Sequence, residues 1–334
     1  MHMNLLVTTP TQIILVDLGK RTTELVRSGD GEYFGMSWNN EVIALTHSNR
    51  DSHSLIKPED VSNSPLGYIG YYANGNNIIK SEELLIGPHQ LMMYQDYIVV
   101  TNTGRNAIDV FDLEGKLVRT QFYSGLKWDL TDNGKEGNHI NSLYETEGRL
   151  YAIAHNNSRK SEIWEIEWPS LERLKIIPTD TEWAHNFWQC EHGRIICNSR
   201  YGSLYEVESG KTVWQANEEK VVTRGLASTT DYIFIGRSEY GNRIQRRHNH
   251  GGIWVVDRAS LKTIDLITLP FSGCVNDIRL VGVQDDCHQG KNLAIDRIKY
   301  IRASQLKDRL IFQLKSVPLF TNYFSKLWKV GSPP

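Results

Sequence analysis

Three histidines, His89, His139 and His185, recur in similar short contexts: Gly-Pro-His-Gln-Leu, Gly-Asn-His-Ile-Asn and Trp-Ala-His-Asn-Phe. Three neutral imidazoles that converge on one point suit Zn²⁺, Fe²⁺ or copper, with an open position for water or substrate. Such a metal acts as a Lewis acid or lowers the pKa of a bound water. Arg224 and Asn276 continue the series. An arginine there can bind a carboxylate at two points or stabilise an oxyanion, and Asn276 is a weaker candidate for contact with the reacting group.

Two other interpretations of the histidines stay open. A single histidine near the start of a strand usually makes satisfied hydrogen bonds in the core. The same residues also suit a polar, water-filled channel, or a ring that recognises a ligand without a metal. The recurrence in one repeat register is what favours a site.

A second set of candidates lies in loops rich in Asn, Ser and Arg, each of which follows the predicted second strand of a repeat. If these loops gather on one face, their arginines form a positive rim that captures an anionic small molecule or a carboxylate-bearing peptide. The alternative is that these residues satisfy tight turns and cover neighbouring repeats. The arginines concerned are Arg50, Arg105, Arg159, Arg200 and Arg237.

The elements that must position these residues are short strands in a repeated order. The clearest unit, Gly87 to Thr120, contains four runs that read as strands, separated by turn signals such as Leu-Glu-Gly-Lys. Four short antiparallel strands make one blade of a β-propeller. Similar units begin near Gly137, Trp183 and Thr223, and a weaker copy begins near Tyr33.

The two ends of the chain complete each other. The N-terminus offers three strands, at Leu5–Thr9, Ile13–Leu18 and Thr22–Arg27, without an innermost strand before them. Val275–Gly282 looks like an innermost strand with no partners after it. We therefore predict an all-β, six-bladed propeller, closed by pairing of these segments, which removes the exposed sheet edges. Five or seven blades stay possible because 51–81 is irregular.

The innermost-strand markers that define this register are Met36, His89, His139, His185, Arg224 and Asn276. We predict that they line the central channel. The propeller is expected to span 1–285, and a C-terminal extension to span 286–334.

The Thr-Asn-Thr-Gly-Arg-Asn-Ala-Ile-Asp-Val-Phe-Asp-Leu-Glu-Gly-Lys segment resembles the pattern of NHL repeats and of strictosidine-synthase-like propellers. This resemblance implies the fold, and the fold hosts lyases, hydrolases, ligand binders and interaction modules. The histidine set is similar to that of peptidylamidoglycolate lyase, an NHL-type propeller with an axial zinc. That similarity implies His89, His139 and His185 as zinc ligands and Arg224 as the group that activates the substrate.

Composition is that of an ordinary globular protein: 334 residues, 40% hydrophobic, 23% charged and a formal net charge of -2. Nothing in this balance points to nucleic acid. Four cysteines without a CxxC pair are too few for a disulfide framework. The N-terminus lacks the features of a signal peptide, and no apolar window is long enough to span a membrane. We expect a cytoplasmic protein.

Two basic segments complete the sequence. Arg243–Gly252 is a basic insertion with four open interpretations: a lid, a phosphate-binding loop, a second metal site or a solvated loop. Lys291–Lys329 carries nine Lys and Arg against two Asp. It is expected to pack on the propeller, to contact a protein partner or to lie on an anionic membrane surface.

Two functions follow from these features. The first is a metal-dependent lyase, hydrolase or oxidative enzyme acting on a small, anionic substrate at the propeller axis. The second is a non-catalytic propeller that binds a protein or peptide through its loop face and basic tail.

Overall fold

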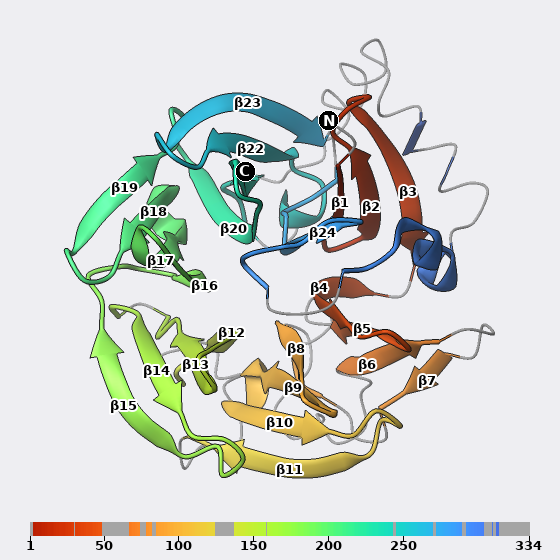
Figure 1. Ribbon diagram of the computed structural model, residues 1–334, viewed down its shortest axis with the longest axis vertical. Coiled ribbons are helices and arrows are strands. Elements are labelled where there is room, and N and C mark those ends of the chain that lie inside the picture. Colours follow the sequence, from red (N-terminus) through yellow and green to blue (C-terminus); the bar gives the residue numbers. More distant parts are fainter. Residues whose placement is uncertain are drawn as a thin grey trace.

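The computed structural model describes residues 3–29, 31–48, 67–73, 78–81, 85–123, 137–157, 159–242, 245–269, 272–288 and 292–303, together with residues 309, 312 and 313. Within these residues the chain forms six four-stranded antiparallel sheets. The sheets are arranged as blades around one axis, each with its first strand near the centre and its last at the periphery (Figure 1). The predicted six-bladed propeller is confirmed.

Each blade takes four consecutive strands of the chain, apart from the blade that closes the ring. The closing blade contains β1 (Asn4–Thr8), β2 (Gln12–Asp17), β3 (Thr22–Ser28) and β24 (Asp277–Val281). The next two contain β4 (Glu32–Trp38), β5 (Ile43–Ser48), β6 (Gly67–Tyr72), β7 (Ile78–Lys80), β8 (Leu91–Tyr94), β9 (Tyr97–Asn102), β10 (Ala107–Phe111) and β11 (Leu117–Phe122). The last three contain β12 (Ile140–Thr146), β13 (Arg149–Ala154), β14 (Glu162–Ile166), β15 (Arg173–Pro178), β16 (His185–Cys190), β17 (Gly193–Asn198), β18 (Ser203–Glu206), β19 (Lys211–Gln215), β20 (Val221–Ser228), β21 (Tyr232–Glu239), β22 (Gly251–Asp257) and β23 (Lys262–Leu269).

The ring closes where the two ends of the propeller pair. Strand β1 is antiparallel to β24, with Asn4 opposite Val281 and Thr8 opposite Asp277. Both strands are buried, so the pairing protects two edges that would otherwise be exposed. The predicted closure by Val275–Gly282 is therefore confirmed, with the regular strand beginning two residues later than the predicted segment.

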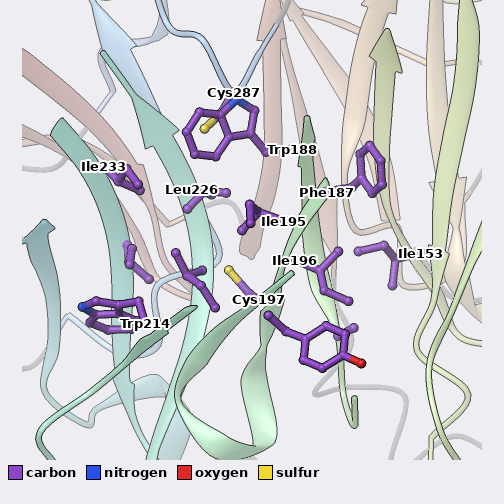
Figure 2. Close-up of a cluster of buried hydrophobic side chains, with 14 of the residues drawn as sticks. Ile153, Phe187, Trp188, Ile195, Ile196, Cys197, Trp214, Leu226, Ile233 and Cys287 are labelled. Atoms are coloured by element: carbon purple, nitrogen blue, oxygen red, sulfur yellow. The ribbon is translucent and has the colours of Figure 1, made fainter. Parts of the chain in front are cut away.

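Apolar side chains hold neighbouring blades together face to face. In Figure 2, Trp188 of β16 lies on the same side as Ile195 of β17 and Leu226 of the following blade, whereas Phe187 lies on the other side, toward Ile153 of the preceding blade. Alternation along each strand directs every second side chain to one face of the blade. These clusters fix the radial position of each innermost strand and therefore the position of whatever lies at the axis.

Four innermost strands carry a bulge in their pairing with the next strand, toward the start of the strand. The pairing shifts between Tyr33 and Met36 in β4, between Ile140 and Ser142 in β12, between His185 and Phe187 in β16 and between Thr223 and Leu226 in β20. A bulge frees residues from the ladder and redirects their side chains. Bulges therefore decide which residues reach the axis.

Polar side chains near the axis tie the innermost strands to one another. Gln90 Oε1 accepts a hydrogen bond from Leu143 N at 2.8 Å, and Asn186 Oδ1 accepts one from Gly225 N at 2.8 Å. Asp277 Oδ2 accepts one from Met36 N at 3.3 Å. Each bond joins different blades, so the axial region is braced by hydrogen bonds as well as by apolar packing.

The chain beyond β24 returns to the closing blade. The 3-10 helix η5 (Ile295–Ile301) buries Ile298 and Ile301 against the β1–β3 side of the core. Ala303 forms a parallel bridge with Arg27 of β3. Packing on the propeller is thus seen for 292–303, while most of the basic stretch lies outside the described residues. The predicted boundary at 285 stays a prediction.

Two further observations concern the whole described chain. All four cysteines are free thiols. Within the described residues, no helix has the length and apolar character needed to cross a membrane.

Candidate functional site

The axis of the propeller is nearly filled by side chains. A channel with a volume of about 20 Å³ remains between the innermost strands, lined among others by His89, His185, Arg224 and Asn276. A space of this size holds about one water molecule. Four of the six residues predicted to line the axis therefore do so.

The other two residues of the predicted register, Met36 and His139, do not line this channel. Met36 is fully buried in the apolar core between blades, and Phe34 and Gly35 reach the axis in its place. Asn141 and Ser142 take the place of His139. The reason is the bulges in β4 and β12, which shift the residues that face the axis.

A larger cavity of about 580 Å³ lies at one end of the channel. It shares His185 and Arg224 with the channel, and His139 lies in its wall. The segments that follow β13 and β17 contribute Asn157 and Ser199, and the last residue of β21 contributes Glu239. This volume is in the range of small-molecule sites, and the cavity combines convergent polar groups with a buried floor.

His185 lies at the floor of this cavity with only 3% of its surface exposed. Its Nδ1 lies 2.7 Å from Trp183 O and 3.0 Å from Ser199 Oγ. A carbonyl oxygen only accepts, and the Ser199 hydroxyl already donates to Thr223 O, so Nδ1 carries the proton. Burial, followed by the nearby charge of Arg224, holds the pKa of His185 well below its usual value. His185 is therefore neutral, and Nε2 carries a lone pair.

The Nε2 atom of His185 is buried and has no hydrogen-bond partner among the described residues. Leaving a buried acceptor unpaired costs about 1–3 kcal/mol. A ligand or a water that donates a hydrogen bond to Nε2 recovers this cost. The atom is thus a proton acceptor oriented by its own ring partners.

His155, which sequence reasoning did not select, faces His185 across the cavity. The two ring centroids lie 5.4 Å apart in an edge-to-face arrangement. His155 Nδ1 accepts a hydrogen bond from the backbone N of Asn157 at 3.0 Å. In the neutral ring the proton therefore lies on Nε2, opposite to the tautomer of His185. The two neighbouring rings therefore hold opposite tautomers.

The histidines form a continuous row from the axis into the cavity. His89 and His139 have ring centroids 5.1 Å apart, and His139 and His155 have centroids 4.7 Å apart. His89 Nδ1 lies 2.9 Å from Gly87 O, so this nitrogen carries a proton. Two of the three predicted histidines thus contact each other directly, and His155 links them to His185.

Arg224 lies beside His185, half-buried in the bulge of β20. Its Nη1 donates to Asn276 Oδ1 at 3.3 Å, and its Nε has no partner among the described residues. Asn276 is fixed by a bond from its amide to Tyr33 O at 2.7 Å. Burial and the nearby charge of Arg246 lower the pKa of Arg224 to about 10, so the guanidinium is still charged at neutral pH. Arg224 therefore offers a charge and an unused donor to an anion.

The predicted arginine rim is only partly assembled at this cavity. Arg200 lines it but pairs with Glu182 at 3.0 Å. Arg237 pairs with Glu218 at 2.5 Å, behind the cavity wall. Arg105 lies over the ring of Phe122, and Arg159 is exposed; neither lines the cavity. Arg50 lies outside the described residues.

The three predicted metal ligands do not come together as a ligand set. His89 and His185 each present Nδ1 to a carbonyl, as metal-binding imidazoles commonly do. However, nowhere in the described part of the chain are three or more His, Cys, Asp or Glu side chains placed to hold a metal ion. The metal stays a prediction, which elemental analysis of protein purified without a His tag tests.

The basic insertion also contributes to the cavity. Its described part contains the 3-10 helix η4 (Gln245–Arg247), and Arg246 lines the cavity together with His139 and His155. Trp183 stacks on Tyr240 with ring centroids 6.0 Å apart, forming an aromatic part of the rim. The only sequence signal for Arg246 was the insertion itself.

No family model matches the sequence, and no curated protein matches it. Solved structures share the fold. The propeller of a nidogen–laminin complex is 12% identical over 83% of this chain and 98% of its own, with a TM-score of 0.59. The periplasmic gluconolactonase of Pseudomonas aeruginosa is 13% identical over 84% and 99%, with a TM-score of 0.53. A protein from Lactobacillus plantarum is 9% identical over 84% and 99%, with a TM-score of 0.55.

These likenesses establish a six-bladed β-propeller and nothing finer, because their sequence identities are low. The resemblances to NHL repeats and to peptidylamidoglycolate lyase stay predictions.

Proposed function

We propose that this protein is an enzyme that acts on a small anionic substrate in the cavity by general acid–base catalysis. The observation that carries the proposal is the pairing of opposite histidine tautomers beside an arginine that lacks a carboxylate partner among the described residues. His185 offers a buried lone pair, His155 offers an N–H group, and Arg224 offers positive charge. A positioned acid and base of this kind contribute about 10²- to 10⁴-fold to a rate.

The reaction that these groups serve best is hydrolysis of a small ester or lactone. A water molecule donates one proton to His185 Nε2 while its oxygen attacks the acyl carbon. Arg224 binds the anionic group of the substrate, and the remaining N–H groups of its guanidinium stabilise the negative charge that develops on the acyl oxygen. His185, protonated by the attacking water, gives that proton to the leaving alkoxide as the acyl C–O bond breaks, while the His155 N–H donates a hydrogen bond to the leaving oxygen. The products are a carboxylic acid and an alcohol, or one hydroxy acid from a lactone, so that water is the only co-reactant.

Substrate binding is also expected to raise the pKa of His185 toward a value that suits a general base. The charge of Arg224 is the second cause of the low pKa of His185. An anion that neutralises Arg224 removes part of that effect and makes His185 a stronger base. The base is therefore activated by the substrate that it serves. The fold neighbour from Pseudomonas aeruginosa, a gluconolactonase, supports hydrolysis as chemistry that this architecture accommodates.

The test is a screen of small lactones and esters that bear a carboxylate or phosphate group, with the wild type beside three variants. His185→Gln and His155→Gln remove the proton-transferring base and the hydrogen-bond donor to the leaving oxygen. His192→Gln is the matched control, because His192 contacts Arg258 O and lies outside the cavity. We expect a loss of about 10²-fold or more in kcat for the first two and none for the control.

Other outcomes separate the alternatives. Turnover that is equal in His185→Gln and in the wild type contradicts the acid–base proposal. Binding of anions without any turnover indicates a ligand sensor. If the protein neither binds nor turns over any of these compounds, the result favours the second predicted function, a propeller that binds a protein partner.

A further inference from the structure

Two arginines from different parts of the chain line the same cavity. Arg224 comes from the innermost strand β20, and Arg246 comes from the insertion between β21 and β22. Their closeness is evident in the pKa of Arg224, on which the charge of Arg246 is the second-largest influence after burial. Both guanidinium groups also bear on the thiol of Cys274, which lies in the cavity wall.

The turn that carries Arg246 is fixed in place. Arg246 Nε donates to Gly241 O at 2.9 Å, and Arg246 O accepts a hydrogen bond from Cys274 N at 2.8 Å. Gly273 has a φ of +83° and lies so close that an added Cβ would be 2.8 Å from Arg246 O. The backbone of this glycine therefore seats the turn against the propeller. A ligand meets an arginine whose position is already set, which lowers the entropic cost of binding.

The two arginines differ from the other arginines near the cavity in their partners. Arg200 and Arg237 are paired with Glu182 and Glu218. Neither Arg224 nor Arg246 forms an ion pair with a carboxylate among the described residues. Two like charges held near one another and partly shielded from water repel, and an anion between them relieves the repulsion.

We propose that the natural substrate carries two anionic groups, one bound by Arg224 and the other by Arg246. The inference rests on the proposed function, because it assumes that Arg224 binds an anionic group of the substrate. It adds that a substrate with a single carboxylate leaves Arg246 without a partner. The substrate class is therefore a dicarboxylate, or a carboxylate that also bears a second acidic group.

The experiment measures affinity by titration calorimetry with matched pairs of probes. Each pair contains an α,ω-dicarboxylate, from malonate to adipate, and the straight-chain monocarboxylate with the same number of carbons. The proteins are the wild type, Arg224→Gln, Arg246→Gln and Arg247→Gln. Arg247 is the matched control, because it lies on the same turn and carries the same charge but does not line the cavity. Circular dichroism confirms that each variant is folded.

We expect the wild type to bind at least one dicarboxylate tenfold or more tightly than its partner monocarboxylate. Arg246→Gln should abolish this preference and still bind the monocarboxylate, whereas Arg247→Gln should keep the preference. Arg224→Gln should weaken both probes.

Two results overturn the inference in distinguishable ways. If the wild type and Arg246→Gln bind both members of every pair equally, but Arg224→Gln weakens them, the second anionic group is refuted and anion binding at Arg224 stands. If no probe binds, or if Arg224→Gln changes nothing, the inference and the proposed anion site fail together.

Discussion

Gly236 of β21 packs against the backbone of Arg224. Replacing Gly236 with alanine should therefore displace Arg224 without changing any side chain of the site. An added Cβ would overlap the carbonyl oxygen of Arg224 and lie 2.6 Å from Val275 Cγ1. Carbon atoms in contact prefer separations of about 3.5–4.0 Å, so something must move by about 1 Å. Val275 is completely buried and has little room to yield. The Arg224 segment of β20 is therefore expected to shift.

This displacement has two measurable consequences. Overpacking of this kind costs about 1–3 kcal/mol in the free energy of unfolding, occasionally more, which urea denaturation measures. A misplacement of about 1 Å at a catalytic group lowers the rate by about 10²-fold. Both quantities should be compared with Gly148→Ala, which strains the backbone at a φ of +74° but whose added Cβ meets nothing within 4 Å. The reasoning is refuted if Gly236→Ala matches wild-type stability and keeps wild-type turnover.

Three further predictions concern the pH dependence of stability and the bonds between blades. Because the folded pKa of His185 lies well below the unfolded value of 6.5, the unfolded chain takes up its proton first, so stability should fall as pH decreases below about 6.5. His185→Gln should remove that component from urea denaturation curves measured between pH 7.5 and 5; identical slopes in both proteins would exclude it. The two bonds from Arg258 lower the pKa of Glu191 to about 2 from 4.5. Glu191→Gln should therefore be less stable than the wild type at neutral pH, with a difference that disappears as pH falls through 4.5 toward 2; a constant difference would contradict the ion pair. Asn186→Ala should lose about 2 kcal/mol or more, because it strips Gly225 N of its acceptor and places alanine at a φ of +50°. Lys220→Ala, at a φ of +56° on an exposed residue, removes no side-chain bond between blades among the described residues and should change stability little, and equal losses in the two variants would show that the Asn186 bond contributes nothing.

The fold could be predicted from the sequence because its signal is repeated. Turn residues and short apolar runs recur along the chain, and the unpaired strand at Val275–Gly282 had only one complement, the three strands at the N-terminus. The one irregular stretch, 51–81, left five or seven blades possible, but the repeat itself was clear elsewhere. Closure is confirmed by the pairing of β1 with β24.

The residues at the axis were harder to predict, because a bulge inserts residues without leaving a clear mark in the sequence. One bulge in β4 places Phe34 and Gly35 at the channel instead of Met36. Another in β12 leaves His139 in the cavity and Asn141 at the axis. A position count along the strand cannot register such a shift.

Two site residues depended on tertiary placement. His155 stands in a loop whose Asn, Ser and Arg content had drawn attention, but only its arginine was considered as a candidate. Arg246 belongs to an insertion whose basic character suggested solvent exposure as well as a phosphate-binding loop. Only the contacts of Cys274 and Gly273 with that turn show that it folds back over the cavity.

The most direct test of the account is the protonation of the histidine pair, measured by long-range ¹H–¹⁵N NMR of the imidazole nitrogens at pH 7. His155→Gln and His185→Gln assign the two sets of signals. The account predicts a neutral His185 with its proton on Nδ1, and a proton on Nε2 of His155. The same tautomer in both rings, or a protonated His185, would contradict the acid–base arrangement from which the proposed function is drawn.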